Sequence, residues 1–284
     1  MRMDDYRESD NVEDRRGGGG ISGGGLGIGG VVLALVISYF TGINPMTLLG
    51  IMEQTPMAHQ SAAPAHKPPA NDPAATFVSK VLASTEDVWT QAFREENRNY
   101  QAPRLVLFNG ATPTACGTGQ TAMGPFYCPG DQKVYIDLAF YRELKDRFHA
   151  PGEFAQAYVV AHEVGHHVQN LLGIAQKVHE AQQRSSKTAA NALSVRMELQ
   201  ADCLAGVWGK RTDTMKHVLD PGDLEKALTA ASAIGDDRLQ QEAQGRIVPE
   251  SFTHGTSEQR VRWFRRGFDS GDMNQCNTFK AAQL

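Results

Sequence analysis

Apolar residues recur at helical spacing through most of the carboxyl-terminal two thirds of this chain of 284 residues. This periodicity predicts helices over 76–97, 138–148, 152–172, 187–209, 221–240 and 257–269. Three short β-prone runs, separated by Gly and Pro, lie between the first two helices at 105–108, 125–128 and 133–136. The pattern predicts an α+β fold that is mostly helical, with a small antiparallel sheet.

A long uncharged stretch covers residues 17–52 and follows a highly charged start. It exceeds the roughly 20 residues that a helix needs to cross a bilayer. We therefore predict a charged segment at 1–20, a glycine-rich transmembrane helix at 21–43, an Ala/Pro-rich linker at 44–75 and one domain at 76–284. A buried glycine-rich core helix is the alternative, because the most apolar run, residues 31–37, is shorter than a full span.

The distribution of basic residues predicts the orientation of this helix. Arg2, Arg7, Arg15 and Arg16 precede it, whereas Lys67 is the one strong base in residues 54–71. The positive-inside rule then places the amino terminus in the cytoplasm and the domain outside, in a single-pass membrane protein. No convincing cleavage site occurs at 38–43, so we expect the helix to be retained.

Charge and cysteine content narrow the possible partners and compartment. The formal net charge of −4 gives no basic excess, which argues against a nucleic-acid partner. The four cysteines suit two disulfides in an oxidising compartment, although four reduced, buried thiols are the alternative. The sequence does not indicate an oligomeric state.

The helix predicted at 152–172 contains the motif HEVGH at residues 162–166. Residues four apart share a helical face, so His162 and His166 can hold one metal ion while Glu163 lies beside its bound water. The flanking positions are apolar, and polar groups buried among them need a compensating partner such as a metal. The motif predicts one catalytic Zn²⁺, with Glu163 as the general base.

A catalytic zinc site needs a third protein ligand and an open position for water. A third histidine on the same segment would require Gly at 169 and His at 172, but Gln169 and Leu172 stand there. Glu198, on the next predicted long helix, is the favoured ligand. Asp202, one turn later, is expected to accept the N–H of a zinc-bound histidine and so orient its ring. An ordinary solvated acidic pair is the alternative.

Hydrolysis of a peptide bond also needs a donor for the oxyanion. His254 lies in a polar loop before the last predicted helix and is the first candidate. Tyr158 and Tyr135 are the alternatives. His167 has the wrong angular position to share a metal with His162, and we expect it to be structural or to support a ligand.

The segments HEVGHHVQ, ELQADCLAGVW, ACGTGQTAMGPFYCPGDQKVYIDLAFY and FTHGTSEQRVRWF resemble the neutral zinc metallopeptidase family of bacterial membrane proteins. The resemblance extends to the amino-terminal ESDNVEDRRGGGG and the hydrophobic span. It implies a zincin-like fold of the glutamate-ligand type, a zinc cofactor and a peptide or protein substrate. It also implies two disulfides, Cys116–Cys128 and Cys203–Cys276.

Two functions are compatible with these features. The first is a membrane-anchored zinc metallopeptidase whose catalytic domain lies outside the cytoplasm. The second is a catalytically silent, membrane-tethered binding or assembly protein that contains zinc. The intact Glu163 favours the enzyme, because a purely structural site has no use for a general base.

Overall fold

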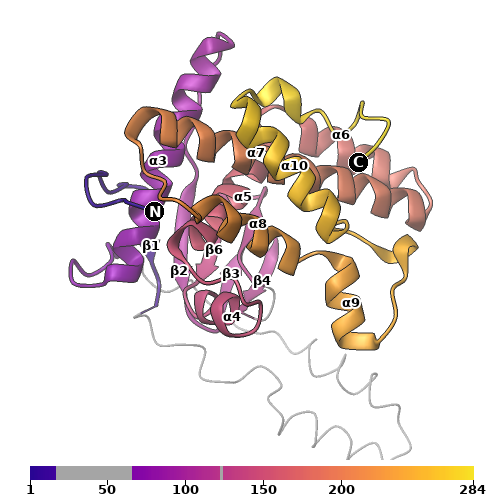
Figure 1. Ribbon diagram of the computed structural model, residues 1–284, viewed down its shortest axis with the longest axis horizontal. Coiled ribbons are helices and arrows are strands. Elements are labelled where there is room, and N and C mark those ends of the chain that lie inside the picture. The colour runs from indigo at the N-terminus through magenta and orange to yellow at the C-terminus, as the bar shows by residue number, and fades with distance from the viewer. Residues whose placement is uncertain (17–65, 122–123) are drawn as a thin grey trace, which may run out of the picture.

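The computed structural model of the chain describes residues 1–16, 66–121 and 124–284 (Figure 1). Its eight described α-helices are α3 (Pro73–Glu95), α4 (Phe140–Asp146), α5 (Glu153–Leu171), α6 (Ile174–Gln183), α7 (Lys187–Lys216), α8 (Asp223–Ala233), α9 (Asp236–Gln244) and α10 (Ser257–Ser270). Its strands are β1 (Val12–Asp14), β2 (Arg104–Phe108), β3 (Ala111–Thr114), β4 (Gly117–Gln120), β5 (Phe126–Cys128) and β6 (Lys133–Asp137). The predicted α+β class is confirmed.

The main sheet has the order β1-β2-β6-β5 and is mixed, so the prediction of an antiparallel sheet was wrong. Strands β1, β2 and β6 are parallel, and only β5 runs antiparallel to β6. Strands β3 and β4 form a separate antiparallel hairpin. The error arose because β2 pairs with β6 and with a strand from the amino terminus rather than with the next strand along the chain.

Local sequence signals explain where several helices begin. The Asp72 side chain accepts hydrogen bonds from the amides of Ala74 and Ala75 at the start of α3, and Pro73 occupies the first turn. Thr256 and Gln259 form a capping box at the start of α10. These caps satisfy amides that the helices themselves leave without partners.

The predicted helix over 221–240 is in fact two helices, α8 and α9, which separate at Ile234 and Gly235. The side chain of Asp237 accepts hydrogen bonds from the backbone and side chain of Ser257. A Cβ at Gly235 would collide with Ser257, so only glycine permits this close approach. Helix α6 was not predicted, and α7 extends beyond the predicted end at residue 209.

Helices α5, α7 and α10 form the centre of the domain, and α3 packs against α5 and α7. Helices α7 and α10 approach backbone to backbone at Gly206 and Gly267, where a Cβ on either would collide with the facing helix. Trp208 on α7 is fully buried and donates a hydrogen bond to Ser84 Oγ on α3 over 3.0 Å. The helix that carries Glu198 is thus fixed on two sides.

Residues 1–16, which we predicted to be a separate cytoplasmic segment, pack against the domain. The predicted transmembrane helix at 21–43 and residues 44–65 of the predicted linker lie outside the described residues. Among the helices that the structure describes, none combines the length and apolar character needed to span a bilayer.

Both predicted disulfides are formed. Cys116 is bonded to Cys128, and Cys203 on α7 is bonded to Cys276 in the 3-10 turn η3 (Met273–Cys276). Since the chain contains four cysteines, none is left as a thiol.

Candidate metal centre

Helix α5 carries the motif at 162–166 through the interior of the domain. His162 and Glu163 are each only 7% exposed. Gly165, between the two histidines, faces α7, and a Cβ there would lie 3.1 Å from the Ala201 carbonyl oxygen. A larger residue would push the helices apart, so the glycine of the motif lets α7 bring Glu198 to the histidines.

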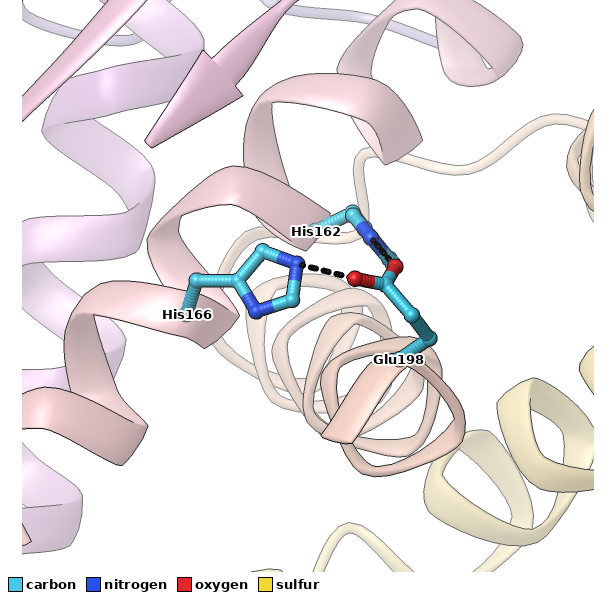
Figure 2. A group of neighbouring side chains, drawn as sticks. All are labelled: His162, His166 and Glu198. Carbon is cyan, nitrogen blue, oxygen red and sulfur yellow. Dashed lines mark hydrogen bonds and ion pairs between the residues drawn. The ribbon is translucent and has the colours of Figure 1, made fainter. Parts of the chain in front are cut away.

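The side chains of His162, His166 and Glu198 converge on one point (Figure 2). Glu198 Oε2 lies 3.1 Å from His162 Nε2, and Glu198 Oε1 lies 3.4 Å from His166 Nε2. One atom from each residue falls within 4.8 Å of the others. Two imidazole nitrogens and a carboxylate oxygen are a donor set that suits zinc, so the residues fit the predicted cofactor.

The described residues bring no fourth histidine, cysteine or acidic side chain into this group. Three protein ligands leave one coordination position for water or substrate, as in catalytic rather than structural zinc sites.

The second ring nitrogen, Nδ1, of both His162 and His166 contacts a further side chain. His162 Nδ1 lies 2.9 Å from Asp202 Oδ1, which is the contact predicted for Asp202. His166 Nδ1 lies 2.9 Å from the side-chain oxygen of Gln169. When Nδ1 donates in this way, the neutral tautomer leaves Nε2 as a lone pair for a metal.

Asp202 belongs to a buried network that the sequence did not reveal. Arg260 on α10 binds both carboxylate oxygens, with Nε 2.9 Å from Oδ2 and Nη2 3.0 Å from Oδ1. The hydroxyl of Tyr158 also donates to Asp202, over 2.5 Å. Arg260 is 2% exposed and Asp202 is fully buried. Arg260 lies in the segment RVRWF, whose pattern is typical of an ordinary amphipathic helix. Only the folded structure shows what Arg260 contacts.

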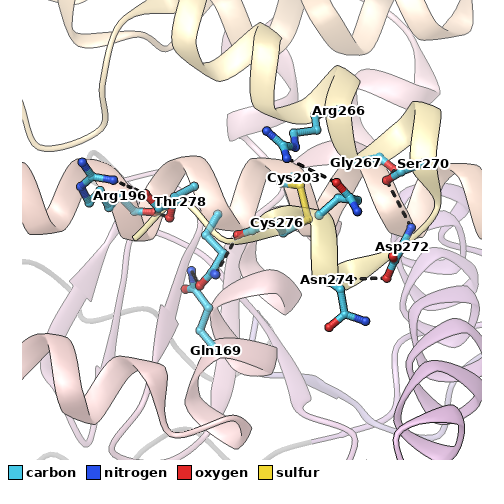
Figure 3. The surroundings of a disulfide bond; sticks show 12 residues. Gln169, Arg196, Cys203, Arg266, Gly267, Ser270, Asp272, Asn274, Cys276 and Thr278 are labelled. Atoms are coloured by element: carbon cyan, nitrogen blue, oxygen red, sulfur yellow. Dashed lines mark hydrogen bonds between the residues drawn. A yellow bond between two sulfur atoms is a disulfide. The ribbon is translucent and has the colours of Figure 1, made fainter. Parts of the chain in front are cut away.

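A chain of hydrogen bonds through Gln169 and Gln200, called the relay below, leads from His166 to the carboxyl-terminal segment. The Gln169 amide donates to Met197 O over 2.7 Å and to Gln200 Oε1 over 3.1 Å. Gln200 in turn donates to Cys276 O over 2.8 Å, beside the Cys203–Cys276 disulfide (Figure 3). Gln169 is fully buried, so its amide has no water to replace these partners.

The charges around the centre favour a cation. Burial alone would lower the pKa of His162, but Asp202 and Glu198 outweigh burial and raise it to about 10. Burial would raise the pKa of Glu198, yet the two histidines hold it well below its usual value. A site that stabilises positive charge to this degree without a metal also attracts a divalent ion, which displaces the protons.

A cavity of about 730 Å³ opens onto His162, His166 and Glu198, and Glu163 and His254 also line it. Burial raises the pKa of Glu163, while His162 and His166 partly oppose this. The remaining lining is largely apolar and includes Phe126, Tyr127, Phe140, Phe148, Val159, Val178, Met197, Ile234 and Leu239.

His254 is held at the cavity by Asp236, the first residue of α9. Its Nδ1 lies 3.2 Å from Asp236 Oδ1, and its backbone amide donates to Asp236 Oδ2 over 2.6 Å. The hydrogen bond that the His254 ring donates to Asp236 is the main reason why the pKa of His254 is raised. The side chain remains half exposed, so it can meet a bound molecule.

The other predicted oxyanion donors are engaged elsewhere. The Tyr158 hydroxyl donates to Asp202, and the Tyr135 hydroxyl donates to Asp131 over 2.7 Å. His167 is fully buried, with Nε2 2.6 Å from Gln101 O and Nδ1 3.0 Å from the Tyr127 hydroxyl, so it ties α5 to neighbouring segments rather than joining the metal group.

Comparison with known proteins agrees with this geometry. The family described as "Putative neutral zinc metallopeptidase" matches residues 1–279. The chain is 56% identical over 286 residues to Uncharacterized protein YpfJ of Escherichia coli K12, covering 98% of this chain and 99% of that protein. It is 47% identical over 195 residues to Uncharacterized protein Rv2575 of Mycobacterium tuberculosis H37Rv, covering 65% of each. No solved structure matches. The chain therefore belongs to the neutral zinc metallopeptidase family.

Proposed function

We propose that this protein is a zinc-dependent peptidase that hydrolyses peptide bonds in the cavity above α5. One observation carries the proposal: two histidines, a glutamate from another helix and the buried Glu163 meet at one end of a cavity large enough for a peptide segment. His162, His166 and Glu198 would hold the ion.

Zinc in this position supplies a Lewis acid that polarises a carbonyl and makes a water molecule acidic near neutral pH. Glu163 takes the proton of the attacking water and delivers it to the leaving amine. Its raised pKa suits a group that must both accept and return a proton near neutrality. Asp202 and Gln169 hold the two imidazole rings in orientation during this exchange.

His254 is the proposed donor to the oxyanion. Because Asp236 accepts a hydrogen bond from Nδ1–H, Nε2 can donate only when the ring is protonated. The same carboxylate raises the pKa of His254 and so favours the protonated ring. Asp236 therefore positions His254 and keeps it able to donate.

The lining of the cavity indicates the substrate class. Phe126 and Tyr127 from β5 face the space together with Val178 from α6 and Leu239 from α9. Burying apolar side chains against such a surface is favourable by about 25 cal/mol per Å². We expect peptides with a large apolar residue beside the cleaved bond to be preferred.

The alternative of a catalytically silent zinc protein has less support. A structural site is closed by four protein ligands, whereas the described residues offer three. Burying Glu163 beside the ligands costs free energy that a silent site would not need to spend.

The two disulfides support a location outside the cytoplasm. Disulfides persist in oxidising compartments and are rare where thiols are kept reduced. We propose that the domain faces the extracytoplasmic side of the membrane.

The test compares the zinc-loaded protein with its Glu163→Gln variant on a broad peptide library. We expect equal zinc content in both and a turnover loss of ~10²–10⁴-fold in the variant, the usual contribution of a general base. Equal turnover would refute the mechanism. No cleavage by the wild-type protein would favour the silent binding protein.

A further inference from the structure

Residues 1–16 form part of the domain that carries the metal centre. Strand β1 is an edge strand of the main sheet and pairs in parallel with β2, in the register Val12 with Leu105 and Asp14 with Leu107. Met1, Met3, Tyr6 and Val12 are buried and belong to the same core cluster as α5 and α7. Figure 1 shows this segment lying against α3 and β2.

Buried polar contacts make the attachment specific. Glu86 on α3 is 8% exposed and accepts hydrogen bonds from Ser9 Oγ over 2.5 Å, from Asn11 over 2.8 Å and from Arg7 over 2.9 Å. The segment thus satisfies with three hydrogen bonds a carboxylate that it helps to bury, as buried polar groups require.

Glu13 makes the reciprocal connection to the sheet. It is 8% exposed and lies 3.0 Å from Lys133 Nζ on β6 and 3.0 Å from Arg104 Nη1 on β2. The amino-terminal segment thus both receives and supplies buried charge partners, as expected for an integral part of one folded unit.

Asp14 and His66, which lie close to the two ends of the described segments, are paired with each other. Asp14 N donates to His66 O over 2.8 Å, and His66 N donates to Asp14 O over 3.0 Å. Next to this pair, Arg16 contacts Asp72 over 2.8 Å and Lys67 contacts Asp10 over 2.9 Å. The two boundaries of residues 17–65 are therefore neighbours in space.

We propose that residues 1–16 and 66–284 lie on the same side of the membrane. A single crossing separates its two ends by about 30 Å of hydrocarbon. Hydrogen bonds of 2.8–3.0 Å between Asp14 and His66 cannot form across that distance. The proposal replaces the single-pass topology predicted from the arginines.

The contacts above fix the shared side without reference to the peptidase activity. Which side it is depends on the proposed extracytoplasmic location, which the disulfides support. On that basis both segments face outward, and Arg2, Arg7, Arg15 and Arg16 are translocated with the domain.

Labelling of single thiols in intact cells tests the proposal. Because the four native cysteines are paired, Glu8→Cys or Lys187→Cys introduces the only free thiol in an otherwise unchanged full chain. Both positions are exposed. We expect a membrane-impermeant maleimide to label both variants equally in intact spheroplasts, with no further gain after permeabilisation.

The other outcomes separate the topology from the location. Labelling of Lys187→Cys in intact spheroplasts, with labelling of Glu8→Cys only after permeabilisation, would overturn the proposal. Labelling of both only after permeabilisation would support the shared side but contradict the extracytoplasmic location proposed above.

A cross-link tests the same claim with little disturbance to the fold. Asp10 and Lys67 are both highly exposed and in contact, so the double variant Asp10→Cys/Lys67→Cys removes one surface ion pair. A short bis-maleimide added to isolated membranes should join the two thiols within one chain. Absence of the intrachain link, when each single variant reacts fully with a monofunctional maleimide, would overturn the proposal.

Discussion

Replacing Gln169 by methionine isolates the relay behind His166. Methionine has nearly the same length and shape but neither accepts from His166 Nδ1 nor donates to Met197 O and Gln200 Oε1. Because Gln169 is fully buried, water does not readily fill the vacated positions. The substitution should therefore weaken both zinc binding and the packing of α5 on α7.

The two effects have different expected sizes. Removing the partner of a metal-bound histidine typically weakens metal affinity ~10–100-fold. At ~1.4 kcal/mol per tenfold, this corresponds to about 1.4–2.8 kcal/mol of binding free energy. Leaving a buried polar group such as Gln200 Oε1 without its donor should cost the metal-free protein about 1–3 kcal/mol of unfolding free energy.

A second substitution separates the role of the Gln169 side-chain oxygen, which accepts a hydrogen bond, from that of its NH₂ group, which donates two. In Gln169→Glu, a carboxylate still accepts from His166 Nδ1 but cannot donate to Met197 O or Gln200 Oε1. We expect its zinc affinity to stay close to that of the wild type while its metal-free stability falls. The matched control is Gln176→Met on α6, whose exposed side chain donates a hydrogen bond to Glu180, and it should change neither quantity.

Zinc affinity is measured by competition with a chromophoric chelator, and stability by urea unfolding of the metal-free protein. If Gln169→Met bound zinc as tightly as the wild-type protein, the proposed role of the relay in supporting His166 would be refuted. Equal loss of affinity in the Met and Glu variants would show that the acceptor atom is not what supports His166.

Three further predictions follow from other contacts. Arg260→Met removes the guanidinium that pairs with the buried Asp202 carboxylate, which keeps only Tyr158 and His162 as partners, and should lower the unfolding free energy by about 3–5 kcal/mol. Adding Asp202→Asn should restore part of this stability, and a double variant no more stable in urea unfolding than Arg260→Met would contradict the pairing. Burial would raise the pKa of Glu13, but hydrogen bonds from Lys133, Arg104 and Arg15 lower it to about 2. Its stabilising effect should be complete above its unfolded-state pKa of about 4.3 and fade as pH falls toward 2, so the stability difference between wild type and Glu13→Gln should shrink over that window; a difference independent of pH would contradict this. Asp236→Asn removes the carboxylate that raises the pKa of His254, so the alkaline limb of the kcat/KM profile should move to lower pH while zinc affinity is unchanged; an unshifted limb would exclude protonated His254 as the donor.

The sequence predicted that His162, His166 and Glu198 would converge because the relevant signals are local. The spacing of His162 and His166 follows from helical periodicity alone. Glu198 could be inferred because few acidic residues occur within long apolar helical patterns. Here local pattern and tertiary structure agree, and the group meets as expected.

Apart from Asp202, the side chains that support His162 and His166 could not be predicted from the sequence. Arg260 and Gln169 occupy ordinary helical positions, and only packing at Gly165, Gly206 and Gly267 brings their partners within reach. The prediction of the sheet was wrong for a related reason. Strand β1 is three residues long and pairs with a strand about ninety positions away, and no local periodicity marks so distant a partner.

On the topology proposed above, the charge asymmetry of the sequence would predict the wrong side for residues 1–16. The arginines of residues 1–16 suggested a cytoplasmic anchor, but several of them have carboxylate partners on the folded domain or within the segment itself. A basic cluster neutralised in this way carries less weight in orienting a helix than the bare count of Lys and Arg implies.

Zinc content and X-ray absorption at the zinc edge test the central claim most directly. The purified full chain should bind one zinc ion per molecule in a shell of two imidazole nitrogens and carboxylate or water oxygens. Glu198→Ala should lose one carboxylate from that shell and most of its affinity for zinc. A spectrum showing sulfur ligands, or an unchanged shell and affinity in Glu198→Ala, would contradict the account.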